Sequence, residues 1–510
     1  MNKRNVLILL TLIILLGSFL RIYKIGSESF WTDETATLYT TYQKPLGIIN
    51  DIYTTTKVAP SYFEHGGQLP TYYLLSNYWT KLVGLSEAKL RLLAAIFGII
   101  DIYFIFVVGN LIFDDRVGLV SAFIFSINYL QINYSQEARS YTFGIFLTLL
   151  SVYFLLNALK QSKFKFWVGY VLVATLLIYT HYFGAFILLF EYIFILIFFK
   201  DYRKCLKEIV ISGVAIFILY LPWLPVLMRQ VSDKNYLNLY FGKNILWDIA
   251  KIFVQFNSWI TPDFPTRVAL REIYHSFNMD VLASFFHTTF LGLITILCVL
   301  GITLVLGICF IAAVFKNKKI GMHNFKNKNV IFVLLWLLIP IVVPVIITLI
   351  FPQSPVFGFV QYAIFASPAY YLLASKGIVK SKKYTLLLSI IVLLSVLPLY
   401  SYYANFDKSQ WREAASYLDA NRQNSEAVLV VAPSNMLAVN YYHPDTSNFI
   451  SIRTIDDIKS ATLDKKSFWL ILAGEQFFDP EGKIKSYTDK NYKIDKEKEF
   501  TGIKIFHYVK

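Results

Sequence analysis

Two adjacent carboxylates follow the first apolar stretch of the chain and have the residue type for acid–base chemistry. Asp33 and Glu34 lie in "SESFWTDETATLY" (residues 27–39), among aromatic and hydroxyl side chains. Charges beside lipid are costly, so they need either a partner or a function. One of the two carboxylates is suited to act as a general base. The alternative is structural: Thr32 or Asp33 caps a helix through "ETATLYTTY".

A second group of charged and polar residues lies in "NYSQEARSYTF" (residues 133–143), which contains Glu137, Arg139 and Tyr141. The planar guanidinium of Arg139 is well suited to hold a phosphate. The alternative is an ion pair between Glu137 and Arg139, flanked by tyrosines of the kind that membrane interfaces favour.

Further candidate residues occur singly, at the ends of apolar runs or in long polar segments. A lone histidine at such a place is mostly satisfied by backbone or water, so each has a structural alternative. These candidates are His65 in "FEHGGQLP", His181 in "YTHYFGAF", and Gln361 and Tyr362 in "FGFVQYAIF".

Neither a metal site nor a disulfide framework is visible. The histidines lack metal-ligand spacing, and Cys205, Cys298 and Cys309 show no framework pattern. The sequence therefore indicates no particular cofactor. A divalent cation stays open, because carboxylates such as Asp33, Glu34 and Glu137 are the ligands it prefers.

The composition indicates a polytopic membrane protein. The chain has 510 residues, of which 56% are hydrophobic and only 16% charged, whereas soluble domains carry about a quarter charged residues. The formal net charge of +15 comes from short basic clusters between apolar runs, as in cytoplasmic loops. Nucleic-acid binding is therefore not expected.

Eleven apolar runs predict about eleven membrane crossings, because ~20 apolar residues span a ~30 Å hydrocarbon core as a helix. Every second connection except "DDR" (114–116) is rich in Lys and Arg, which predicts that the N-terminus is cytoplasmic. The first run has no cleavage site and is expected to stay as a span. The predicted spans are 5–22, 88–113, 117–132, 141–159, 166–182, 183–199, 209–228, 284–315, 330–351, 360–375 and 385–403.

Two long segments, 23–87 and 229–283, are predicted on the outer side. The apolar stretch 69–84 contains Asn77 and Lys81, and it is expected to be an amphipathic helix at the outer surface rather than a span. We expect short helices that line a cleft in 229–283. The acid pair and Arg139 would then share one outer cavity.

The chain divides into a membrane domain, 1–404, and a soluble outer α/β domain, 405–510. The spacing of Trp411, Ala414, Ala415 and Leu418 predicts a helix face, and "AVLVVA" (427–432) and "FWLILA" (468–473) have the pattern of buried strands. "GIKIFHYV" (502–509) alternates and is expected to be an edge strand.

The order of these motifs resembles family-39 glycosyltransferases of the GT-C superfamily, the protein O-mannosyltransferase-like enzymes that include bacterial aminoarabinose transferases. The resemblance rests on "WTDET", on "HGGQLPTYYLLSNYWTKLVGLSEAKLRLLAAIFG" and on "YSQEARSY" and "WREAASYL". It covers most of residues 1–410. Gly66, Gly67 and Gln68 stand where prolines are usual. Gln361 precedes Tyr362 where many relatives have arginine, so Arg139 or Arg229 would supply that charge here, or the donor differs.

The resemblance implies a GT-C-like fold and transfer of a sugar from a polyprenyl-phosphate carrier to an acceptor hydroxyl outside the cytoplasm. The acceptor would be a lipid, a glycan or a protein, and membrane lipids would surround the enzyme. It assigns Asp33 as base, with Glu34 orienting it or binding acceptor. Phosphate is a good leaving group, so one carboxylate suffices for inverting displacement, unlike the pair in a glycosidase. Arg139 would stabilise the phosphate charge.

A lipid or glycan transporter of the cell envelope is the main alternative, since it too would place polar groups inside a helix bundle. No inverted repeat or pair of broken spans supports it. A scaffold for envelope assembly, with the outer domain as the binding part, is a further alternative.

Overall fold

The structure is a computed structural model that describes residues 1–55, 69–232, 245–257, 290–315, 328–350, 360–405, 408–443, 445–474, 479 and 481–510. The chain forms two compact units. The helical unit comprises Met1–Ile25, Leu69–Tyr72 and Arg91–Ala404. The mixed unit comprises Gly26–Gln68, Tyr73–Leu90 and Asn405–Lys510.

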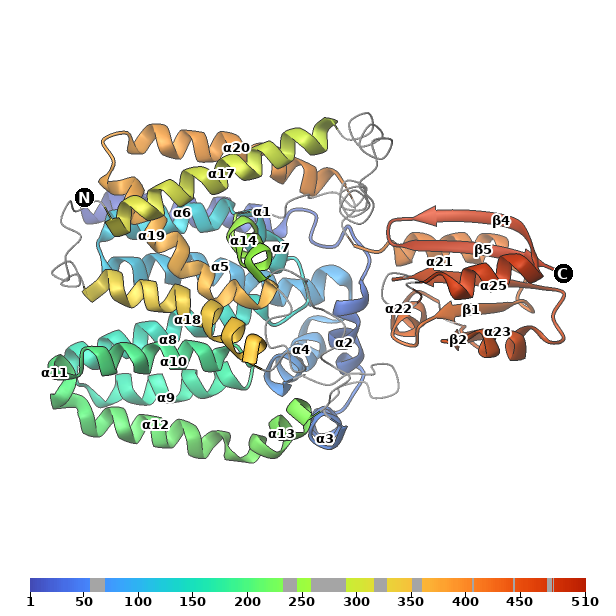
Figure 1. Ribbon diagram of the computed structural model, residues 1–510, viewed down its shortest axis with the longest axis horizontal. Helices are drawn as coiled ribbons and strands as arrows, with labels where there is room; N and C mark the ends of the chain where they lie inside the picture. Colours follow the sequence, from blue (N-terminus) through green and yellow to red (C-terminus); the bar gives the residue numbers. More distant parts are fainter. Residues whose placement is uncertain are drawn as a thin grey trace. The chain divides into compact units, whose positions relative to one another are not determined.

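Helices build the helical unit, as Figure 1 shows. In chain order they are α1 (Lys3–Ile22), α5 (Glu87–Ile112), α6 (Asp115–Ile127), α7 (Tyr129–Ser135), α8 (Tyr141–Gln161), α9 (Phe164–Ile178), α10 (Gly184–Ile197), α11 (Phe199–Tyr202), η1 (Arg203–Cys205), α12 (Leu206–Tyr220), η2 (Leu221–Trp223), α13 (Leu224–Ser232), α14 (Ile245–Gln255), α17 (Phe290–Phe315), α18 (Lys328–Ile350), η5 (Val360–Ala366), α19 (Ser367–Lys380) and α20 (Tyr384–Ala404).

The prediction of a polytopic helical membrane protein is confirmed, and helices lie at each of the eleven predicted spans within the described residues. Among the described residues, seven helices are long and apolar enough to cross a membrane, with residues 199–231 counted as one, or eight if α6 and α7, bent by 61°, form one span. The count is below eleven because α9, α10 and α19 have only 15, 14 and 14 residues. At 1.5 Å per residue each is about 22 Å long, less than the ~30 Å core.

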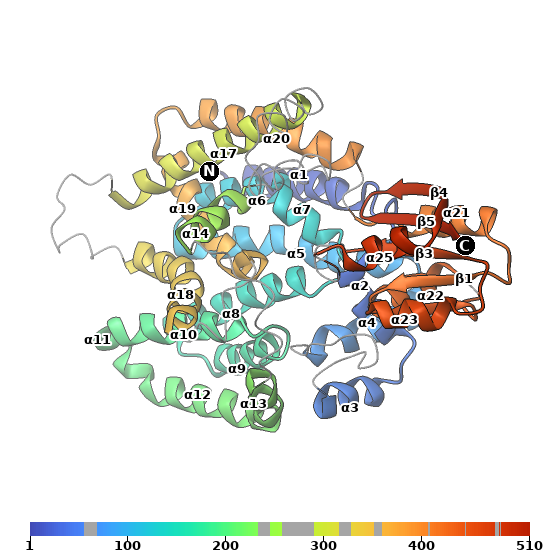
Figure 2. The same ribbon diagram turned by 45° about the vertical axis from the view of Figure 1, so that its right-hand side comes forward.

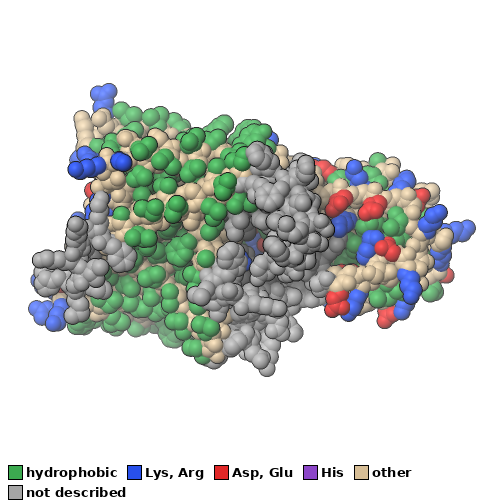
Figure 3. Space-filling view, turned by 45° about the horizontal axis from the view of Figure 1, so that its top comes forward, with side chains coloured by type: hydrophobic (Ala, Val, Ile, Leu, Met, Phe, Trp, Pro, Cys, Tyr) green, Lys and Arg blue, Asp and Glu red, His purple; other side chains and the backbone are tan. Residues whose placement is uncertain are grey.

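The outer surface of these helices is apolar. On α1, Leu7, Leu12, Leu15 and Phe19 are all more than half exposed. Figure 3 shows hydrophobic side chains over most of the helical unit, with Lys and Arg gathered at its left-hand end. Such a surface is stable in lipid and not in water.

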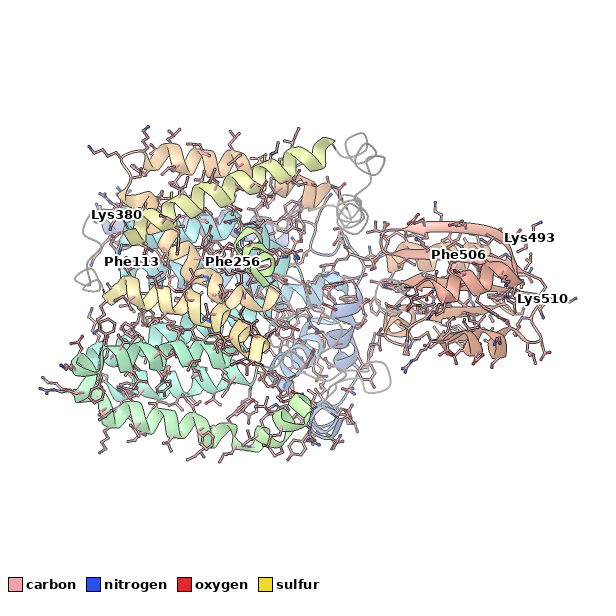
Figure 4. All side chains as sticks on the ribbon, viewed as in Figure 1. Phe113, Phe256, Lys380, Lys493, Phe506 and Lys510 are labelled. Atoms are coloured by element: carbon pink, nitrogen blue, oxygen red, sulfur yellow. The ribbon has the colours of Figure 1, made fainter. Side chains whose placement is uncertain are left out.

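Segments that the sequence predicts to link helices on the cytoplasmic side contact one another. The Lys376 ammonium lies 4.2 Å from the Phe113 ring centroid, and Lys328 pairs with Asp201 at 3.0 Å. Ser162 Oγ lies 3.1 Å from Cys205 Sγ. Figure 4 shows Phe113 and Lys380 at the same end of the unit. Predicted outer connections also meet, because the Thr71 hydroxyl donates to the Tyr179 carbonyl at 2.8 Å.

The mixed unit joins the first predicted outer segment to a five-stranded sheet. Its helices are α2 (Thr32–Thr41), α3 (Pro45–Thr55), α4 (Pro70–Val83, with its first residues in the helical unit), α21 (Trp411–Asn421), α22 (Asn435–Tyr442), α23 (Ile455–Thr462) and α25 (Lys483–Asn491). Its strands are β1 (Ala427–Val431), β2 (Phe449–Ile452), β3 (Ser467–Ala473), β4 (Lys493–Phe500) and β5 (Ile503–Val509). Figure 2 shows helices on either side of the strands.

The strand order is β2-β1-β3-β5-β4, with β1 parallel to β2 and β3, and β5 antiparallel to β3 and β4. Alternate residues of the central strands pack into two cores. Val428, Val430 and Trp469 face the side on which Trp411 and Leu418 of α21 pack. The predicted helix face at 411–418 and the two predicted buried strands are therefore confirmed.

The expectation that residues 502–509 form an edge strand is wrong. β5 lies between β3 and β4, and the edge is β4, "KIDKEKEF". β4 is exposed along nearly all its length, and its charges protect an edge from pairing with other chains. β4 was not predicted because most of its residues are polar and show no apolar alternation.

The two other predicted segments have partial outcomes. α4 confirms a helix at 69–84: Asn77 is buried and its amide donates to the carbonyls of Thr40 (2.7 Å) and Gln43 (2.9 Å), while Leu82 is 80% exposed. Most of 229–283 lies outside the described residues. α13 and α14 are the short helices described there.

Candidate active site

Asp33 and Glu34 lie in the first turn of α2, in the mixed unit. The N-cap is Trp31, with extended backbone and no side-chain cap bond. The prediction that Thr32 or Asp33 caps the helix is therefore wrong, since both lie inside it. Carboxylates in a first turn are favoured by the positive end of the helix dipole, which lowers the cost of placing two there.

The two carboxylates differ in exposure. Glu34 is fully buried, and its Oε1 lies 3.8 Å from the ammonium of Lys408, which is 7% exposed. Asp33 is half-buried. Asp33 is therefore the carboxylate of the pair with access to a reactant, whereas Glu34 is held inside the unit.

The structure brings another set of predicted residues together in the helical unit. Tyr141 begins α8, His181 lies in the turn between α9 and α10, and Tyr362 belongs to η5. The His181 ring centroid lies 6.1 Å from that of Tyr141 and 5.1 Å from that of Tyr362. Arg139 lies two residues before Tyr141, and its amide donates to the Glu137 carbonyl at 2.7 Å.

His181 is a neutral member of this set. Burial and the positive charge of Arg139 lower the pKa of His181 to about 3. Its Nδ1 accepts from the Phe183 amide at 3.2 Å, so its Nε2 carries the proton. A neutral imidazole beside a guanidinium adds a donor without a second charge, which suits recognition of a single anionic group.

Glu137 is 4% exposed and lies next to Gln136, whose role is structural. The Gln136 amide donates to the carbonyls of Leu20 (3.3 Å), Arg21 (3.0 Å) and Tyr23 (2.8 Å). Its Oε1 accepts from the Tyr402 hydroxyl at 2.9 Å. Part of "YSQEARSY" thus closes the C-terminal end of α1, whose last carbonyls lack helical partners.

Three other predicted residues have limited or different placements. His65 lies outside the described residues, and the side chain of Gln361 does too, although its backbone belongs to η5. Arg229 lies on α13, where its Nε donates to the Pro225 carbonyl at 3.3 Å. Across the described part of the chain, no group of three or more His, Cys, Asp or Glu residues is placed to hold a metal ion.

Sequence reasoning missed the groups that hold the acid pair's segment. Arg412 pairs with Glu87, and these residues belong to two motifs, "WREAASYL" and "GLSEAKLRL", that lie 325 residues apart. The Tyr442 hydroxyl also donates to Glu87 Oε1 at 2.8 Å. The motifs themselves were the only available signal, and no local pattern connects them.

One segment of the chain is similar to a known protein family. Residues 67–228 match the sequence profile described as dolichyl-phosphate-mannose-protein mannosyltransferase. This segment is about a third of the chain, and over it the chain resembles a family of membrane glycosyltransferases. The predicted resemblance is confirmed, and the match supports a glycosyltransferase that depends on a lipid-phosphate sugar. No curated protein sequence matches the chain.

Solved structures agree on the fold. The chain resembles the oligosaccharyltransferase of Archaeoglobus fulgidus tethered to an acceptor peptide, with 14% identity and a TM-score of 0.53 over 100% of this chain and 74% of that one. AglB from the same organism, in complex with an inhibitory peptide and a dolichol-phosphate, gives 13% identity and a TM-score of 0.50, over 99% and 74%. The GT-C-like fold is confirmed.

Proposed function

We propose that this transferase moves a sugar from a polyprenyl-phosphate carrier to an acceptor hydroxyl on the outer side of the membrane. The observation that carries the proposal is the half-buried Asp33 in the first turn of α2, beside a fully buried Glu34. The family match supports the lipid-phosphate donor. Archaeal AglB, of similar fold, has been captured with a dolichol-phosphate, which supports a polyprenyl-phosphate here.

The reaction is a direct displacement. Asp33 takes the proton from the acceptor hydroxyl as that oxygen attacks the anomeric carbon, and the bond from that carbon to the phosphate oxygen breaks on the opposite face. The phosphate leaves with the electron pair and needs no strong acid, so no second carboxylate has to flank the bond. The configuration at the anomeric carbon inverts.

Arg139 and its neighbours would bind the phosphate of the donor. Its guanidinium can make two parallel hydrogen bonds to phosphate oxygens, and neutral His181 can donate a third without repelling Arg139. Tyr141 and Tyr362 line the same site with aromatic surface. Charge that grows on the leaving phosphate is stabilised most strongly where water is excluded.

Asp33→Asn tests the role of the base. The variant is expected to fold normally and to lose transfer by at least about a hundredfold, in line with the usual contribution of a general base. The substrate is the lipid-linked sugar that accumulates in a deletion strain, identified by mass spectrometry, and the acceptor is the membrane fraction of that strain. Asp51→Asn, in the same segment, is the matched control, because the Asp51 carboxylate accepts from the Gln43 amide within the fold.

Three results would count against the proposal. One is undiminished transfer by Asp33→Asn. Another is a product whose anomeric carbon keeps the donor's configuration. The third is movement of intact lipid-linked sugar across vesicles without any transfer, which would support the transporter alternative.

A further inference from the structure

The fully buried Glu34 pairs with a residue far away in the sequence, Lys408. It occupies the position after Asp33 in α2, and Lys408 approaches its Oε1 at 3.8 Å with only 7% of its side chain exposed. Solvent and salt screen a buried pair far less than a surface pair. Removing one member leaves an uncompensated charge in the interior, which is costly.

Lys408 stands on a fixed piece of backbone. Two residues later, the Gln410 amide donates to the Thr501 carbonyl at 3.0 Å. In return the Thr501 amide donates to Gln410 Oε1 at 2.8 Å. These bonds tie the chain before α21 to the connection between β4 and β5. The Lys408 ammonium therefore reaches Glu34 from a segment that is hydrogen-bonded, two residues later, to the connection between β4 and β5.

The segment that leads into α2 is held by the same part of the chain. The Arg412 amide donates to Ser29 Oγ at 3.0 Å, and its Nη1 donates to the Ser27 carbonyl at 3.2 Å. The Phe30 amide donates to the Tyr442 hydroxyl at 2.8 Å. Both the entry to α2 and its first turn are thus set by α21, α22 and the residues just before them.

We infer that Lys408 is a positioning residue of the transfer reaction, which balances the charge of Glu34 and fixes the first turn of α2 so that Asp33 alone serves as base. This inference rests on the proposed role of Asp33. Two adjacent carboxylates repel each other and would also repel an arriving anionic phosphate. The Lys408 ammonium, 3.8 Å from Glu34 Oε1 and almost fully buried, offsets that repulsion from within the unit.

The first experiment measures transfer by Lys408→Met in the full-length enzyme, with the lipid-linked sugar and membranes of the deletion strain. We expect kcat to fall about tenfold, with KM for the donor changed less than twofold. The acid limb of the kcat profile should move to higher pH by about one unit, because losing a nearby cation raises the pKa of a carboxylate. Lys408→Arg should restore at least half of the wild-type kcat.

Lys459→Met is the matched control. Lys459 also pairs with a carboxylate of the mixed unit, Asp456, but both side chains are more than half exposed. This variant should keep the wild-type kcat and pH profile. Should Lys408→Met not elute as a single species, Lys408→Gln is measured in its place, with the same expectations.

A second readout does not depend on activity. Hydrogen exchange in the full chain should rise at least fivefold in peptides covering residues 31–42 for Lys408→Met and stay at the wild-type level for Lys459→Met. Unchanged kcat together with unchanged exchange would overturn the inference. So would a loss of kcat that Lys408→Arg does not restore and that leaves the acid limb in place, since that pattern marks a purely structural lysine. If Asp33→Asn keeps full activity while exchange rises as expected, the role of Asp33 fails and the anchoring of α2 stands.

Discussion

At the scale of single residues, one short motif serves two purposes. In "YSQEARSY", Gln136 closes the C-terminal end of α1 through three donated bonds and one accepted bond. Arg139, three residues later, lies close enough to His181 to lower its pKa. A family motif is therefore not uniformly a site, and only the contacts separate its structural residue from its candidate binding residue.

Gln136→Met should destabilise the helical unit. Methionine keeps the length of the side chain but removes every hydrogen bond, leaving buried carbonyls and the Tyr402 hydroxyl without this partner. We expect a loss of about 2–4 kcal/mol, since each unsatisfied buried polar group costs about 1–3 kcal/mol. Thermal unfolding of the purified protein in detergent measures it.

Tyr402→Phe is the graded comparison, because it removes the bond from Tyr402 to Gln136 and keeps the three bonds that the Gln136 amide donates. Its melting temperature should lie between those of the wild type and Gln136→Met. Equal melting temperatures for all three proteins would contradict the structural role of Gln136.

Candidate site residues at the ends of apolar runs could be predicted from the sequence. Their partners far away in the sequence could not. Asp33 and Glu34 stand out because they directly follow an apolar run, and His181 because it ends one. Lys408 lies in "NFDKSQ", which resembles any polar linker. Its contact with Glu34 is set by the packing of the whole mixed unit, to which sequence spacing gives no access.

At the scale of secondary-structure elements, burial decided which strands were recognisable. β1 and β3 are almost entirely buried, so continuous apolar runs mark them. β2 has a buried residue only at each end and β4 has none, and both escaped prediction. The same reasoning explains β5, whose alternation resembles an edge strand although neighbours flank it on both sides.

Glu426 lies directly before β1, and its carboxylate should make the stability of the sheet depend on pH. Burial alone would raise its pKa, but hydrogen bonds from Ser467, the Gln423 amide, Trp469 and His507 lower the pKa of Glu426 to about 2. A carboxylate with a lowered folded pKa stabilises the fold above its unfolded value, near 4.5. That stability, about 2–3 kcal/mol, is lost as the pH falls from about 4.5 towards 2.

Hydrogen exchange of peptides from β1 and β5 in the full-length protein tests this dependence. Comparing wild type with Glu426→Gln at each pH cancels the intrinsic effect of pH on exchange. The variant should exchange faster at pH 6, and the two proteins should converge towards pH 2. A constant difference at all pH values would refute the contribution of the carboxylate charge. Asp456→Asn, at an exposed position, should match the wild type throughout.

At the scale of the whole molecule, contacts between connecting segments agree with the alternation of cytoplasmic and outer connections that hydropathy predicts. Predicted cytoplasmic connections contact one another, as Lys328 does Asp201 and Lys376 does Phe113, and predicted outer connections do likewise around His181. Hydropathy could predict this because each apolar helix reverses the chain across the membrane. The number of full crossings could not be predicted, because composition does not reveal that α9, α10 and α19 are short.

Labelling of introduced cysteines tests which end faces the cytoplasm. The basic connections predict that exposed Lys163 and Lys382 are inside and that Glu481, 68% exposed in the mixed unit, is outside. Intact cells should label Glu481→Cys with a membrane-impermeant maleimide, and should leave Lys163→Cys and Lys382→Cys unlabelled until the membrane is opened. The wild type reports labelling of Cys205, Cys298 and Cys309. The reverse pattern would put Asp33 in the cytoplasm, where an acceptor outside the cell could not reach it, and the proposed reaction would then have to be abandoned.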